Sequence, residues 1–128
     1  MSSQVPADLR YAKSHEWVRV SGATATVGIT DHAQHELTDI VFVELPAVGR
    51  TVKAGEACAV VESVKTASDI YSPVSGTILE INPDVVANPS KVNSTPYAEG
   101  WFFKLKLTQP SETNALLSPA DYSKQIGA

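Results

Sequence analysis

Residues 60–70 read Val60-Val61-Glu62-Ser63-Val64-Lys65-Thr66-Ala67-Ser68-Asp69-Ile70. Valine and isoleucine at the two ends favour strands, and the small polar residues between them favour a turn. The segment therefore predicts a β-hairpin with Lys65 at its tip. A lysine at a hairpin tip holds its ammonium away from the protein and is accessible to acylation. Because most turn lysines are only solvated residues, the flanking sequence has to distinguish the two interpretations.

Two turn-like segments, residues 52–56 and 72–76, lie on either side of the predicted hairpin. A β-rich segment with a lysine hairpin midway between two turns resembles the lipoyl and biotinyl carrier domains, in which a prosthetic group is joined to that lysine by an amide bond. Biotin carriers have methionine on both sides of the lysine, whereas Val64 and Thr66 stand here. The resemblance therefore favours a lipoyl carrier.

Within the lipoyl carriers, the sequence resembles the glycine cleavage system H protein family. Glu62, three residues before Lys65, and Gly76, eleven after it, fit the pattern that lipoate-attaching enzymes read in this family. Blocks that match the family in order, over about residues 8–127, are Ser14-His15-Glu16-Trp17, residues 27–33, residues 40–46, residues 62–65 and Gly100-Trp101. Thr66 stands where the family usually has alanine, and Thr38 stands near a position often occupied by glycine; neither is the attachment lysine.

The fold that this resemblance implies is mainly β, a two-layer β sandwich or flattened barrel of the lipoyl type. It implies a single domain over residues 1–128, with a core at about 8–108 and C-terminal helices at about 111–127. From the residue patterns alone, strands are expected over residues 9–12, 15–20, 23–29, 40–45, 77–81 and 101–107.

Helical segments are expected at three places. A short helix over residues 32–37 follows a capping Thr30 or Asp31. Residues 82–100 contain three prolines and predict helical turns and loop. Ser111 and Ser118 are the expected N-caps of two C-terminal helices.

Composition excludes several classes of protein. The 128 residues suffice for one core, and no apolar run approaches the roughly 18 residues that span a bilayer. A net charge of −4, with no basic cluster longer than residues 104–106, argues against a nucleic-acid partner. Cys58, the single cysteine, is expected to be a buried hydrophobe and cannot form an internal disulfide, which fits a reducing compartment.

Residues that could support other chemistry are few. His32 and His35 share a helical spacing that metal ligands use, but no third ligand is apparent, so no metal site is expected. Glu16 with Asp69, or Glu44 with Glu62, could act as an acid/base pair in a small enzyme. Neither pair has a nucleophile or a phosphate-binding loop beside it, which disfavours an enzyme.

The function that the resemblance implies is a carrier that catalyses nothing itself. Lipoate, held as N6-lipoyl-lysine at Lys65, would accept the aminomethyl group from glycine decarboxylase, a pyridoxal phosphate enzyme. It would present that group to an aminomethyltransferase and be reoxidised by dihydrolipoyl dehydrogenase. Ser14, Glu16 and Asp69 match the family's positions for a cleft that shelters the loaded arm, and the two carboxylates are expected along one groove leading from the tip.

Two alternatives remain beside this interpretation. The first is a lipoyl carrier for another 2-oxo acid dehydrogenase or acyl-relay pathway, which the N-terminal block and C-terminal helices disfavour. The second concerns location. Residues 1–8 lack a targeting pattern, so a cytoplasmic protein is expected, with the mitochondrial matrix as the alternative if a transit peptide was removed. The protein is also expected to be a monomer.

Overall fold

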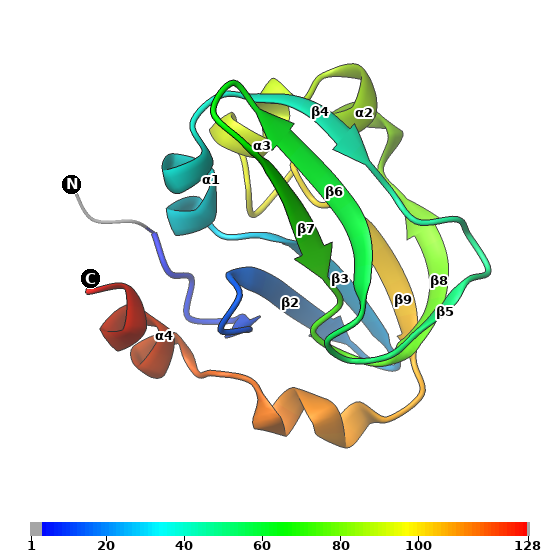
Figure 1. Cartoon of the computed structure of the whole chain (residues 1–128). Helices are drawn as coiled ribbons and strands as arrows, with labels where there is room; N and C mark the ends of the chain where they lie inside the picture. Colours follow the sequence, from blue (N-terminus) through cyan, green and yellow to red (C-terminus); the bar gives the residue numbers. More distant parts are fainter. Residues whose placement is uncertain (1–3, 128) are drawn as a thin grey trace.

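The computed structural model describes residues 4–127 and contains two antiparallel β-sheets packed as layers (Figure 1). The six-stranded sheet has the order β1 (Arg10–Tyr11), β2 (Glu16–Ser21), β3 (Thr24–Ile29), β9 (Phe103–Leu107), β8 (Gly76–Ile81) and β5 (Thr51–Val52). The three-stranded sheet has the order β4 (Ile40–Glu44), β6 (Ala57–Ser63) and β7 (Ala67–Tyr71). The predicted two-layer β sandwich is confirmed.

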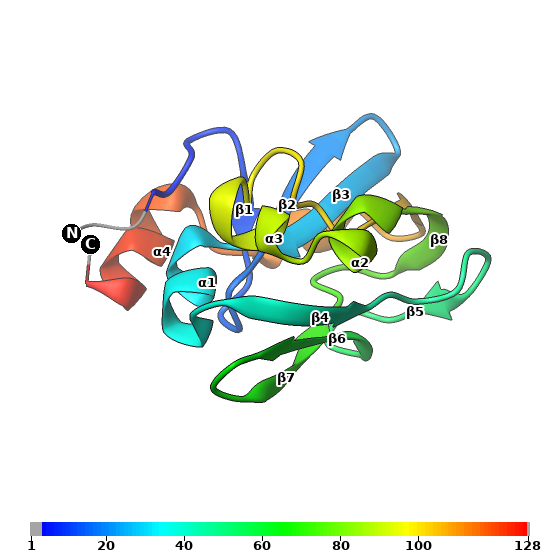
Figure 2. The same cartoon turned by 90° about the horizontal axis from the view of Figure 1, so that it is seen from above.

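The main core lies between the two sheets. Seen from above, the layer of β4, β6 and β7 lies on one side and β2 and β3 on the other (Figure 2). Val61 and Ile70 of the lysine hairpin are buried in this core, together with Val27, Phe103 and Leu105 of the six-stranded sheet. Alternation along the strands therefore directs one face of the hairpin inward and leaves Glu62 and Asp69 on the outer face.

Short helices close the ends of the sandwich: α1 (Asp31–Leu37), α2 (Pro83–Ala87), α3 (Ser90–Ser94), the 3₁₀ helix η1 (Pro110–Ala115) and α4 (Pro119–Ile126). Thr30 caps α1 by accepting the Ala33 N–H at 3.2 Å, and Ser118 caps α4 by accepting the Asp121 N–H at 3.2 Å. The prediction for Ser111 is wrong. The first C-terminal helix is a 3₁₀ turn that starts at Pro110 without a side-chain cap, and proline fixes the backbone of its first position.

A second, smaller core joins the two ends of the chain. Tyr11 stacks on Tyr122 of α4 with ring centroids 4.6 Å apart, and Leu9 and Trp17 complete the cluster. The backbones of Tyr11 and Leu117 exchange two hydrogen bonds, of 3.0 and 2.7 Å. This core fixes α4 and the segment before it against the start of β2. No helix among residues 4–127 is long and apolar enough to cross a membrane.

Gly76 is required by close packing and not by its backbone angle. It is buried at the start of β8, between Val52 of β5 and Leu107 of β9, and its φ is not positive. A Cβ atom at this position would lie 2.3 Å from the Lys106 carbonyl oxygen. The glycine at the end of the turn-like segment 72–76 is therefore required by the approach of β9.

Gly76→Ala is expected to lower the free energy of unfolding by about 3 kcal/mol, because the new methyl group meets a backbone carbonyl that cannot rotate away. Urea unfolding followed by tryptophan fluorescence measures this loss. Gly22→Ala is the matched control: its Cβ would meet open space at φ +61, so only backbone strain of about 1 kcal/mol is expected. Equal losses in the two variants would contradict the packing explanation.

Candidate functional site

The lysine hairpin forms as predicted, with Lys65 in the turn between β6 and β7. The Ser63 hydroxyl accepts the N–H groups of Lys65 and Thr66, both at 3.1 Å, and the Ser63 N–H donates to the Thr66 carbonyl at 2.7 Å. One serine therefore organises the whole turn. The Lys65 side chain is exposed, and its Nζ donates to the Glu36 carbonyl oxygen at 3.4 Å.

The turn that follows α1 lies beside this tip and is strained. Thr38 has φ 66 and ψ −152, a combination that β-branched residues rarely adopt and that glycine accepts readily. Thr38 also stands near a position often occupied by glycine in the resembled family. The threonine at this position therefore destabilises the backbone conformation at the C-terminal end of α1.

Thr38→Gly is expected to raise the free energy of unfolding by about 1 kcal/mol, because relief of the strain exceeds the extra entropy of glycine in the unfolded chain. Thermal or urea unfolding measures the change. Thr66→Gly serves as the control, since Thr66 does not have positive φ and should gain nothing from the substitution. A loss of stability in Thr38→Gly would show that the threonine is not strained.

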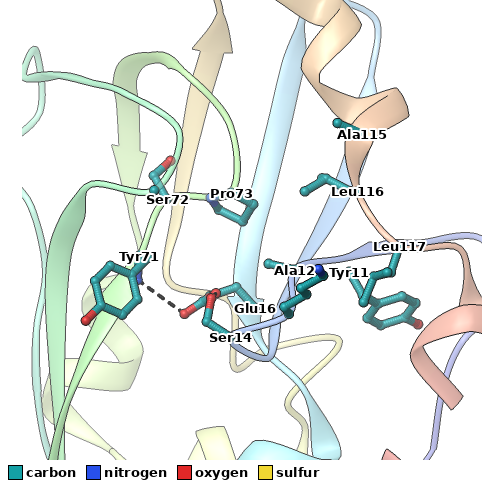
Figure 3. Close-up of a pocket in the computed structure, with 12 residues that line it drawn as sticks. Tyr11, Ala12, Ser14, Glu16, Tyr71, Ser72, Pro73, Ala115, Leu116 and Leu117 are labelled. Atoms are coloured by element: carbon teal, nitrogen blue, oxygen red, sulfur yellow. Dashed lines mark hydrogen bonds between the residues drawn. The ribbon is translucent and has the colours of Figure 1, made fainter. Parts of the chain in front are cut away.

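A cavity of about 280 Å³ lies at the other end of β7, between the start of β2 and the C-terminal segment (Figure 3). Its lining is mostly apolar and includes Tyr11, Tyr71, Pro73, Leu116 and Leu117. For comparison, a dry cavity of about 150 Å³ in another protein holds benzene. The cavity is therefore large enough for a small organic group.

Glu16 is the buried charged group of this cavity and is only 1% exposed, whereas Lys13, the other charged residue of the lining, is exposed. One carboxylate oxygen accepts the Ser14 hydroxyl, and the other accepts the Tyr71 N–H at 3.2 Å. Burial raises the pKa of Glu16 to about 7, and these two hydrogen bonds only partly offset the effect. Within residues 4–127, Glu16 has no ion-pair partner. A cation entering the cavity would supply the missing countercharge.

Comparison with known proteins decides between the alternatives for such a hairpin and cavity. Residues 9–128 match the family model described as "Glycine cleavage H-protein". The chain is 57% identical, over 98% of its length, to the glycine cleavage system H protein of Opitutus terrae, and the match covers 99% of that protein. The chain belongs to the glycine cleavage H-protein family.

Other relatives agree with this membership. The glycine cleavage system H protein of Alcanivorax borkumensis is 56% identical, with 97% of each chain covered. The crystal structure of the H protein from Mycobacterium marinum superposes with a TM-score of 0.88 at 40% identity and covers 97% of this chain and 100% of that one. The protein is therefore a lipoyl shuttle component of the glycine cleavage system, and the 2-oxo acid dehydrogenase alternative is not favoured.

Asp69 lies apart from the Glu16 cavity. It is exposed on the outer face of β7 and lines a different depression together with Glu44, Arg50 and Val60. The sequence expectation that Glu16 and Asp69 lie along one groove stays a prediction. Asp69 does not line the Glu16 cavity itself, but Tyr71, which does, follows two residues later on the same face of β7.

Glu62 and Gly76, the two expected recognition residues, lie in different sheets. Glu62 is exposed on β6, opposite Phe42 of β4 and Ala67 of β7, close to the tip. Gly76 is buried in the six-stranded sheet. Of these two residues, only Glu62 is exposed to a protein that approaches Lys65.

The histidines of α1 take part in pairs along the helix. His32 lies 3.4 Å from Glu36 and His35 lies 3.6 Å from Asp31, both at i,i+4 spacing. No group of three or more metal-ligating side chains occurs among residues 4–127. Cys58 is buried, as expected, and burial raises the pKa of its thiol to about 12, which disfavours the reactive thiolate.

Sequence reasoning missed one wall of the cavity. This wall closes the cavity opposite Pro73 and Tyr71 (Figure 3). It consists of Ala115, the last residue of η1, and of Leu116 and Leu117, which follow it. These residues are about 100 positions away from Glu16 in the sequence. No local pattern indicates such a contact; the only signal was the amphipathic C-terminal segment, which needs an apolar surface to cover.

Proposed function

We propose that this protein carries lipoate as N6-lipoyl-lysine on Lys65 and acts as the non-catalytic carrier of the glycine cleavage system. The observation that carries the proposal is the arrangement of an exposed tip lysine at one end of β7 and a cavity with a buried carboxylate at the other. Family membership supports lipoate as the group, because family members carry it.

The surroundings of Lys65 fit an acylated side chain. Acylation replaces the ammonium with a neutral amide, which needs no countercharge. Within residues 4–127, Lys65 forms no ion pair, and its Nζ bonds only to the Glu36 carbonyl oxygen. Conversion to an amide therefore breaks no salt bridge and leaves one N–H that can still donate to this carbonyl.

The length of the arm matches the length of β7. A lipoyl-lysine side chain extends to about 14 Å. The strand from Ala67 to Tyr71 advances four residues, which corresponds to about 13 Å. Because Lys65 lies two residues before the strand, an arm that runs along β7 from the tip reaches the second half of the strand, towards Tyr71, whose backbone N–H donates to Glu16.

When bound, lipoate supplies the dithiolane sulfur that takes up the aminomethyl group and releases it again. The chain's own residues do the rest. Glu16 and Ser14 would accept hydrogen bonds from the cationic amine of the cargo, and the apolar lining would exclude water from it. Asp69, exposed four residues after Lys65, would contribute a negative charge beside the path of the arm.

The partners follow from this role. We infer that the carrier docks in turn on glycine decarboxylase, the aminomethyltransferase and dihydrolipoyl dehydrogenase, and that lipoate-attaching enzymes modify it. Membership in the glycine cleavage H-protein family supports all of these partners. The bacterial relatives support the cytoplasm as the place of action, and the protein is proposed to work as a monomer.

Mass spectrometry of protein produced in cells supplied with lipoate tests the proposal. A mass increase of about 188 Da on the peptide that contains Lys65 is expected for one lipoyl amide. Modified protein should then be reduced by glycine in the presence of glycine decarboxylase, whereas unmodified protein should not. Failure of the modified protein to accept any group from glycine would overturn the proposed carrier role.

Glu62 is the residue that we propose the attaching enzyme reads directly, while Gly76 contributes by keeping β8 and β9 in place. Glu62→Gln is expected to lower the initial rate of lipoate attachment several-fold without a change in stability, because it removes one exposed charge beside the tip. Purified ligase and intact-mass time courses measure the rate. Glu80→Gln, an exposed carboxylate on the other sheet, is the control and should attach lipoate at the wild-type rate.

A further inference from the structure

The tip of the lysine hairpin rests against the turn that follows α1, which we call the α1 corner (residues 36–40). The Lys65 Nζ donates to the Glu36 carbonyl oxygen at 3.4 Å, and the Val64 N–H donates to the Asp39 carbonyl oxygen at 3.1 Å. Ile40, the last residue of the corner, pairs with Ser63 in the sheet. The orientation of the tip therefore depends on the position of this corner.

The α1 corner does not hold this position by itself. Thr38, at its centre, has backbone angles that favour glycine. The conformation persists only if surrounding groups fix it. The groups that fix it are thus as important for the tip as the corner itself.

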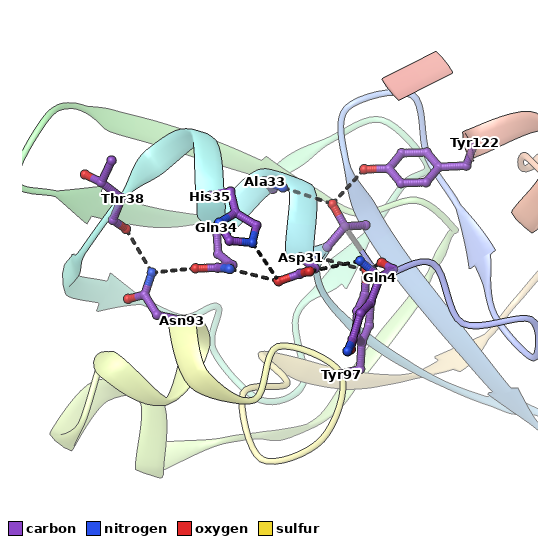
Figure 4. A network of polar contacts seen from close by, with 10 residues as sticks. Gln4, Asp31, Ala33, Gln34, His35, Thr38, Asn93, Tyr97 and Tyr122 are labelled. Atoms are coloured by element: carbon purple, nitrogen blue, oxygen red, sulfur yellow. Dashed lines mark hydrogen bonds and ion pairs between the residues drawn. The ribbon is translucent and has the colours of Figure 1, made fainter. Parts of the chain in front are cut away.

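Asn93 is the side chain that fixes the corner. It lies on α3, and its side chain makes three hydrogen bonds to α1 and the residues after it. Figure 4 shows the two of these to Gln34 and Thr38. Its Nδ2 donates to the Thr38 carbonyl and to the Gln34 Oε1, both at 2.9 Å, and its Oδ1 accepts the Ile40 N–H at 2.9 Å. One amide therefore ties together the residues before and after the strained position.

We propose that Asn93 is a positioning residue for the acylation of Lys65. It acts through the α1 corner, whose carbonyl groups at Glu36 and Asp39 hold the tip. Asn93 itself touches neither the lysine nor any group attached to it. This inference rests on the proposed attachment of lipoate to Lys65 and extends it to a residue 28 positions further along the chain.

Loss of the Asn93 hydrogen bonds lowers the fraction of molecules in which the tip has the conformation that the attaching enzyme binds. A tip that is competent in only one-tenth of the molecules raises the apparent KM about ten-fold, because binding must first select the competent form. The chemistry after binding is unchanged, so kcat should stay within about two-fold of the wild-type value. A residue with a merely structural role would lower the amount of folded protein and leave KM unchanged.

The test compares Asn93→Ala with Asn82→Ala. Asn82 is a matched control, because its side chain also donates twice through Nδ2, to Glu99 and Trp101 carbonyls, and accepts one N–H through Oδ1. It caps α2 and does not bond to the corner or the tip. Both variants lose three hydrogen bonds, so their global stabilities should fall by similar amounts.

Two measurements separate the variants. Amide hydrogen exchange at Val64, normalised to a core amide such as that of Leu105, should be about ten-fold faster in Asn93→Ala and unchanged in Asn82→Ala. The KM for lipoate attachment should rise about ten-fold in Asn93→Ala only. If Asn93→Ala does not fold, Asn93→Asp serves instead: it keeps the acceptor for Ile40 and loses the donor to Thr38, and it should shift both quantities in the same direction.

Equal Val64 exchange and equal KM in the Asn93 and Asn82 variants would overturn the inference. Failure of the proposed function gives a different result, namely that lipoate is not attached to Lys65 even in the wild type. The exchange measurement does not need lipoate, so it still decides whether Asn93 holds the tip in that case.

Discussion

Lys65→Arg is expected to abolish lipoate attachment completely while the fold stays intact. Arginine keeps the positive charge and the exposure of the tip, but its guanidinium stays protonated and does not form the amide. The free energy of unfolding should change by less than about 0.5 kcal/mol, because the side chain is exposed and forms no ion pair within residues 4–127. Intact mass after incubation with lipoate, ATP and a lipoate ligase measures the result.

The control for this variant is Lys53→Arg, an exposed lysine in the turn before β6. It should gain one lipoyl group, about 188 Da, to the same extent as the wild type. Attachment of lipoate to Lys53 or Lys91 in Lys65→Arg, or full glycine cleavage with that variant, would rule out Lys65 as the attachment site.

Glu16→Gln is expected to make the protein more stable at pH 8 and to speed the spontaneous release of its cargo. Folding raises the pKa of Glu16 from 4.5 to about 7 because the carboxylate is buried. Below pH 4.5 the group is protonated in both states and has no effect. Between pH 4.5 and 7 the folded protein binds more protons than the unfolded one, so stability falls as the pH rises. Above pH 7 the full cost, about 3 kcal/mol, is present.

Glutamine removes this cost and keeps the local hydrogen bonds. Its carbonyl oxygen can accept the Tyr71 N–H, and its amide can donate to the Ser14 hydroxyl oxygen. Urea unfolding of both proteins from pH 4 to pH 8 measures the effect. The difference in unfolding free energy should be near zero at pH 4 and reach about 3 kcal/mol in favour of Glu16→Gln at pH 8. A constant difference across this range would show that Glu16 is not held at a raised pKa.

The same variant should release its cargo several-fold faster once it is loaded. A charge-assisted hydrogen bond from a cationic amine to a carboxylate contributes about 1.5 to 3 kcal/mol, and a neutral amide loses most of it. Spontaneous release of formaldehyde and ammonia, without the transferase, follows the loss. Lipoate attachment and reoxidation by dihydrolipoyl dehydrogenase should stay near the wild-type rates.

Asp69→Asn and the double variant Glu16→Gln/Asp69→Asn separate the two carboxylates. Because Asp69 is exposed and lines another depression, its charge is screened, and its removal should have the smaller effect. Equal release rates in the double variant and the wild type would mean that neither carboxylate holds the cargo.

Local patterns in the sequence predicted the strands, the lysine hairpin and the caps at Thr30 and Ser118. These features depend on neighbours within a few residues, which is why they can be inferred from one sequence. The burial of Glu16 could not. Glu16, Trp17 and Val18 are all buried because β2 is covered on both faces, by the main core and by the second core around α4. Alternation along a strand assumes that one face is open to water.

Long-range contacts account for the other differences. Glycine is required at position 76 because the backbone of β9, some thirty residues later in the sequence, lies so close. Asn93 bonds to the Thr38 carbonyl, 55 positions earlier in the sequence. The sequence contains both residues but no spacing that relates them to their partners. The same holds for Asp69: the face of β7 on which it lies depends on the pairing register with β6, which no local pattern specifies.

The position of β9 between β3 and β8 has a consequence for how the chain folds. The β6–β7 hairpin is local and can form within microseconds, but an isolated hairpin is only marginally stable in water. Its inner face packs on a sheet that closes only when residues 103–106 pair with residues 24–27, a step of high contact order and slow rate. The acceptor lysine is therefore presented in its final geometry only after nearly the whole chain has been synthesised and has folded. An attaching enzyme that requires this geometry would then modify only molecules that have completed folding.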